Sequence, residues 1–128
     1  MILPPRTEAL KAVLEAMPGA VGEPMTAARG STPLVILFKV MGKMFAILNV
    51  RGTENVILKC DPHLAEVLRE QYAGVGHRSH LDRRFWIAVD LNSDVPAGEV
   101  ERLAAGSYAL VRAGLTKKQR AELDALAG

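Results

Sequence analysis

The sequence predicts an α+β domain in which one mainly antiparallel sheet packs against helices. Three observations lead to this prediction: apolar residues at helical spacing near both ends of the chain, runs of β-branched and large apolar residues between them, and short polar breaks between those runs. The expected element order is α-β-β-β-α-β-α-α. With 128 residues, 49% of them hydrophobic, the chain fits one domain covering residues 1–128.

The first helix is expected from Thr7 to Met17, where apolar side chains recur at the i, i+3, i+4, i+7 spacing. These side chains belong to Leu10, Val13, Leu14 and Met17. Pro18 and Gly19 end the helix. Residues 20–32 mix glycine, proline and serine with little periodicity, so we expect an irregular connection there.

Three strands are expected next, over Leu34 to Val40, Met44 to Val50 and Asn55 to Cys60. Met41 and Gly42 join the first two in a tight hairpin, and the sequence leaves the turn type open. The polar segment 51–54 separates the second strand from the third. This pattern is typical of an antiparallel meander.

Asp61 and Pro62 predict the start of the second helix, because an aspartate caps free N–H groups and proline fits the first helical position. We expect the helix to end near residue 73, before Gly74 and Gly76. Its predicted buried stripe is Leu64, Val67, Leu68 and Tyr72.

A fourth strand is expected from Phe85 to Leu91. Alternation directs one set of side chains toward the helices and the other set away from them. The inward set is Phe85, Ile87, Val89 and Leu91, and the outward set is Trp86, Ala88 and Asp90.

Two helices complete the chain. The first runs from near Pro96 to Gly114, with its stripe at Val100, Leu103, Ala104, Tyr108, Leu110 and Val111. Residues 116–119 form a capping box for the second helix, which carries Leu123 and Leu126.

Composition narrows the functional classes. Cys60 is the only cysteine, which excludes an intramolecular disulfide and agrees with a reducing cytoplasm. No apolar run approaches the roughly 20 residues of a membrane span, and the N-terminus lacks a secretory signal pattern. We therefore expect a cytoplasmic protein without a membrane partner, as a monomer or homodimer. The formal charge of +2 is too small to indicate nucleic acid by itself.

Several spaced segments, taken in order, carry a resemblance to a known family. They are residues 38–46, 58–62, 68–72, 80–86 and 107–111. Together they resemble the MmcQ/YjbR family, over a region from about residue 35 to the C-terminus. The resemblance implies a frataxin-like (CyaY-like) α/β fold, described as double-wing, a proposed DNA-binding role and no known catalytic activity.

The sequence departs from the family pattern at three positions. Met41 stands where a second hairpin glycine is expected, Phe85 where a histidine is expected and Ile87 where an asparagine is expected. The last two replace hydrogen-bonding groups by apolar ones, which argues against a polar site there.

Basic residues close to Trp86 are the candidate nucleic-acid site, since lysine and arginine neutralise phosphates and an outward tryptophan can stack on a base. The candidate residues are Lys39, Lys43, Lys59, Arg78, His80, Arg83, Arg84 and Trp86. The simpler alternative is that Trp86 is covered by the first helix or by residues 20–32 and that the arginines are solvated. The rival function is a non-enzymatic protein- or small-ligand-binding module, dimeric through an apolar sheet edge or face.

Other chemistries have weak support. Cys60, Asp61 and His63, or His77 and His80, lack the spacing of a closed zinc site. Cys60 beside His63 has no recognisable third group for nucleophilic catalysis. We therefore expect no metal, no cofactor and no catalytic site.

Overall fold

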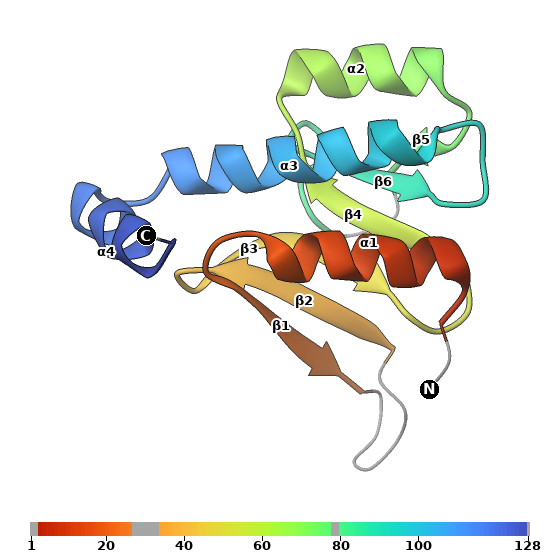
Figure 1. The fold of residues 1–128 in the computed structure, drawn as a ribbon. Helices are drawn as coiled ribbons and strands as arrows, with labels where there is room; N and C mark the ends of the chain where they lie inside the picture. The colour runs from red at the N-terminus through yellow and green to blue at the C-terminus, as the bar shows by residue number, and fades with distance from the viewer. Residues whose placement is uncertain (1–2, 27–33, 78–79, 128) are drawn as a thin grey trace.

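A computed structural model describes residues 3–26, 34–77 and 80–127. Helices α1 and α3 lie across one face of a six-stranded antiparallel sheet, and α2 lies at the β5 margin (Figure 1). The strand order is β1-β2-β3-β4-β6-β5. The helices are α1 (Pro5–Ala16), α2 (Pro62–Gln71), α3 (Ala97–Ala113) and α4 (Lys117–Ala127). The strands are β1 (Ala20–Met25), β2 (Val35–Val40), β3 (Lys43–Asn49), β4 (Asn55–Lys59), β5 (Val75–Gly76) and β6 (Trp86–Asp90).

The predicted α+β class is confirmed, and the predicted elements occur in the predicted order with β1 and β5 added. The prediction of an irregular connection over residues 20–32 is wrong for its first part, because Ala20–Met25 pairs with β2. Pro24 is tolerated because β1 is an edge strand. Gly22 lets β1 approach closely, since a Cβ there would lie 3.1 Å from both Ile36 Cγ2 and Phe38 Cε1.

Alternation along the strands separates two faces of the sheet. One face carries buried residues that join the helices in a single core, among them Phe38, Leu48, Leu58 and Val89. The opposite face, which we call the open face, carries half-buried apolar residues at Leu37, Ile47 and Ile57. Within the segments that the structure describes, no helix packs on the open face.

The hairpin between β2 and β3 has positive φ at both central residues, 49° at Met41 and 80° at Gly42. Two positive φ values define a type I′ turn, whose twist matches the flanking strands. Beyond the hairpin, the buried Ser107 of α3 bridges β3 and β4. Its Oγ donates to the Phe45 carbonyl (2.5 Å) and accepts from the Lys59 N–H (2.8 Å).

Helix α2 begins as predicted, with Asp61 Oδ1 accepting from the backbone N–H groups of His63 (3.0 Å) and Leu64 (3.2 Å). The predicted buried stripe is wrong in part. Leu64 and Val67 are each 42% exposed, and the buried residues are Ala65 and Leu68. The small Ala65 side chain faces the core, which turns the helix by about one residue from the predicted orientation.

The C-terminal helices follow the predicted boundaries. In α3, Leu110 is 40% exposed, contrary to its predicted place in the stripe, whereas Val100, Leu103, Ala104 and Val111 are buried. The capping box is confirmed, with Thr116 N–H donating to Gln119 Oε1 (3.0 Å) and Gln119 N–H donating to Thr116 Oγ1 (3.1 Å). In α4, Leu123 is buried and Leu126 is 74% exposed.

Candidate nucleic-acid interface

Most of the predicted site residues lie at one end of the sheet. The register pairs Val40 with Lys43 and Lys59 with Trp86, so the ends of β2 and β4 meet the starts of β3 and β6. We call this region the basic end; it consists of Lys39, Lys43, Lys59, Arg83, Arg84 and Trp86. His80 is exposed in the segment that leads toward β6, and Arg78 lies outside the described residues.

A tight turn that begins at Asp82 leads into β6. The Asp82 carbonyl accepts from the N–H groups of both Phe85 and Trp86, each at 3.0 Å. The Cys60 N–H donates to the Phe85 carbonyl (2.7 Å), so the β4–β6 register continues through Phe85, which lies on the same side of the sheet as Ile87. Phe85 is 37% exposed, while Ile87 is buried as predicted.

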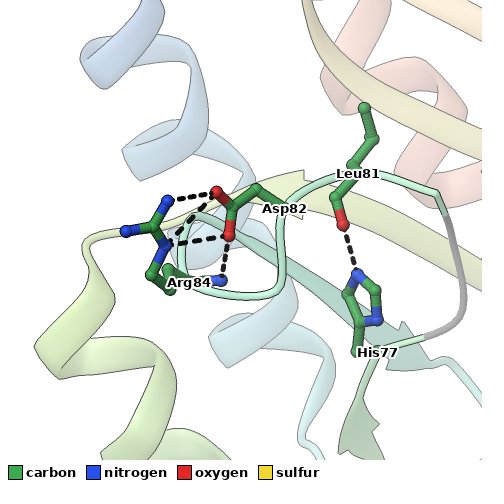
Figure 2. A network of polar contacts seen from close by, with 4 residues as sticks. All are labelled: His77, Leu81, Asp82 and Arg84. Carbon is green, nitrogen blue, oxygen red and sulfur yellow. Dashed lines mark hydrogen bonds and ion pairs between the residues drawn. The ribbon is translucent and has the colours of Figure 1, made fainter.

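The Asp82 carboxylate fixes the side chain of Arg84 (Figure 2). Arg84 Nη2 lies 2.7 Å from Asp82 Oδ2, and the Arg84 backbone N–H lies 2.9 Å from Oδ1. These hydrogen bonds lower the pKa of Asp82 to about 2. The Arg84 guanidinium also lies 5.2 Å from the centre of the Phe85 ring. Arg84 therefore contributes little free positive charge.

Arg69 of α2 anchors the same turn from the other side. Its Nη2 donates to the carbonyl oxygens of Arg83 (2.6 Å) and Trp86 (3.0 Å). Burial, followed by the nearby charge of Arg83, lowers the pKa of Arg69. The sequence analysis missed Arg69, because nothing in its local pattern indicates contacts to carbonyls 14 and 17 residues away.

The lysines of the basic end differ in their neighbours. Lys39 Nζ lies 2.8 Å from Glu23 Oε2 on the neighbouring strand β1, so this charge is neutralised. Lys43 is exposed, and Lys59 is half-buried beside its cross-strand partner Trp86. In the described part of the chain, Lys43, Lys59 and Arg83 form no ion pair with an acidic side chain.

A groove of about 390 Å³ opens at the basic end. It is lined by residues 59–62, Phe85, Trp86 and Leu110. Trp86 is half-buried, so neither α1 nor any other described segment seals it. Across the turn, a polar pocket of about 350 Å³ places Glu66 and Glu70 among Arg69, Arg83 and Arg84. The positive surface is thus interrupted on the α2 side.

Cys60 and Asp61, which the sequence analysis considered for metal binding, lie at the start of α2. Cys60 is buried, and burial, followed by the charge of Asp61, raises the pKa of its thiol. The Asp61 carboxylate caps α2. Among the described residues, no three His, Cys, Asp or Glu side chains stand close enough together to hold a metal ion.

Comparison with known proteins shows the family to which this sequence belongs. The YjbR family profile matches residues 15–110. The chain belongs to the YjbR family. It is 35% identical to Escherichia coli K12 YjbR over 71 residues, which are 55% of this chain and 60% of that protein. It is 27% identical to Escherichia coli O157:H7 YbdF over 85 residues, which are 66% of this chain and 70% of that protein.

Solved structures show the same fold. A Deinococcus radiodurans protein with a DUF419 domain aligns with a TM-score of 0.77 and 29% identity, over 91% of this chain and 86% of its own. A Pseudomonas syringae protein aligns with a TM-score of 0.57 and 24% identity, over 70% and 86% respectively. None of the described helices of this YjbR-family protein is both long and apolar enough to cross a membrane.

Proposed function

We propose that this YjbR-family protein binds nucleic acid through the basic end of its sheet. The observation that carries the proposal is the cross-strand pair of Lys59 and Trp86. It sets a cation that can meet a phosphate directly beside an aromatic ring that can stack on a base. Both side chains are partly accessible.

The neighbouring contacts support a prearranged surface. Arg69 and Asp82 hold the turn that presents Arg83, and the hairpin presents Lys43 at the same end. Because Glu23 and Asp82 already neutralise Lys39 and Arg84, the phosphate contacts fall to Lys43, Lys59 and Arg83. A small number of phosphate contacts gives modest, salt-sensitive affinity.

The test is fluorescence anisotropy with a labelled DNA at several salt concentrations. The double variant Lys59→Gln/Arg83→Gln should bind more weakly and with a shallower salt dependence, the slope falling by roughly one unit for each phosphate that the protein no longer neutralises. Arg51→Gln is the matched control, since Arg51 lies in the turn between β3 and β4 at the opposite end of the sheet. No DNA binding at low salt, or equal binding by all variants, would remove the proposal.

A second candidate function is self-association through the open face. Val21 and Met25 of β1 are 58% and 48% exposed, and they continue the half-buried apolar surface of Leu37, Ile47 and Ile57. The register aligns Leu37, Ile47 and Ile57 in one row across the strands. A twofold axis along that row would place Lys59 of one copy near Asp90 of the other, since these residues lie at opposite ends of the face.

Sedimentation velocity tests this second candidate. Wild-type protein should sediment as a dimer, and Ile47→Lys should sediment as a monomer that retains its fold by circular dichroism. A wild-type monomer across the accessible concentration range would rule the candidate out.

A further inference from the structure

We infer that the groove between Trp86, Phe85 and Leu110 is a seat for an unpaired nucleobase, so that the protein prefers single-stranded nucleic acid to duplex. This inference rests on the proposed function and specifies its ligand. It starts from the groove of about 390 Å³ at the basic end. That volume falls within the range of about 300 to 1,000 Å³ found for small-ligand pockets.

The chemistry of the walls fits a flat aromatic ligand. The residues that line the groove include the aromatic residues Trp86 and Phe85 and the apolar residues Pro62 and Leu110. Phe85 and Leu110 are 37% and 40% exposed, so these apolar side chains are accessible to a ligand and are not buried in the hydrophobic core. A base inserted there would cover surface that the fold leaves in water.

The charges around the groove fit the backbone attached to such a base. Lys59 lines the groove, and Arg83 lies within the turn that precedes Phe85. The acidic residue in the groove wall is Asp61, whose Oδ1 accepts from two N–H groups at the start of α2. This contact and the positive end of the helix offset its negative charge. An anionic ligand with an aromatic group therefore meets complementary partners.

The shape of the site favours a single strand. Bases in a duplex are stacked on each other and paired, so rings within a groove can engage a base only after it leaves the stack. An unpaired base does not have to be unstacked and unpaired first, so its binding requires less free energy. Stacking on protein aromatic rings is possible for every base type. An apolar peptide side chain could fill the groove but would not use Lys59 and Arg83.

The test compares three probes of about ten nucleotides: a single strand, its duplex and the same strand with the bases removed. Trp86 is the only tryptophan, so quenching of its emission reports stacking directly. The single strand should bind tightest and quench Trp86. Phe85→Leu should weaken single-strand binding by roughly 5- to 150-fold, the range for loss of one stacked base. Leu126→Ala, at an exposed apolar position on α4, should bind as wild type does.

The outcomes separate the two claims. If the three probes bind equally and Phe85→Leu changes nothing, while Lys59→Gln/Arg83→Gln still weakens binding, the base seat is wrong and the basic end contacts backbone alone. If none of the probes binds at low salt, both the base seat and nucleic-acid binding are wrong. Quenching of Trp86 by an acidic, apolar peptide, with no effect of the single strand, would also overturn the inference.

Discussion

Asp82 is the residue on which the order of the turn before β6 depends. Its carbonyl accepts two backbone N–H groups, and its carboxylate accepts from the backbone and guanidinium of Arg84. The backbone carbonyl and the side chain of this one residue thus hold the turn that precedes β6. The sequence predicted that basic and aromatic residues lie near each other, but its local pattern indicated neither these hydrogen bonds nor the 37% exposure of Phe85.

The pH response of Asp82 tests this arrangement. Its folded-state pKa of about 2 lies below the ordinary value of 3.8, so its contribution to folding is complete above about pH 4 and is lost as pH falls through about 2. In Arg84→Gln the Asp82 pKa should rise toward its ordinary value. Carbon-13 NMR titration of the carboxyl group measures both values. An ordinary pKa in the wild-type protein would show that the contact with Arg84 does not persist in solution.

The elements show what the sequence could and could not predict. Strands β2, β3, β4 and β6 and the helix starts follow from hydrophobic patterns and capping residues, which act locally. Strand β1 was missed because Gly22 and Pro24 resemble loop residues, although both suit an edge strand packed against Phe38. Because β1 was not predicted, the ion pair between Glu23 of β1 and Lys39, which neutralises Lys39, was not predicted either. Tertiary contacts of this kind leave no local signal.

Gly74, just before β5, and Gly76, within β5, give a matched prediction about packing. A Cβ at Gly74 would lie 1.9 Å from Ser93 Oγ and 2.4 Å from Ser93 Cβ, whereas a Cβ at Gly76 meets nothing within 4 Å. Gly74→Ala should therefore lower the free energy of unfolding by about 1–3 kcal/mol. Gly76→Ala should be close to neutral or slightly stabilising. Urea unfolding followed by Trp86 fluorescence measures both, and equal effects would contradict the close approach of residues 74 and 93.

At the scale of the whole molecule, basic residues that lack an acidic partner in the described segments gather at one end of the sheet. Lys43, Lys59 and Arg83 lie at one end of the sheet, and Glu54, Asp90 and Asp94 lie toward the other. Asp94 accepts from the N–H groups of Ala73 and Gly74, which lowers the pKa of its carboxyl, and Arg51 adds a positive charge at the same end. Because the net charge is only +2, the proposed binding depends on this local group of cations and not on the charge of the whole molecule.

The most direct test of the basic end as the working surface is a map of amide chemical shifts during titration with a short oligonucleotide. The largest changes should occur at Lys43, Lys59, Arg83 and the indole N–H of Trp86. Arg51 and Asp90 should change little. Changes confined to that opposite end, or none at saturating oligonucleotide in low salt, would contradict the account.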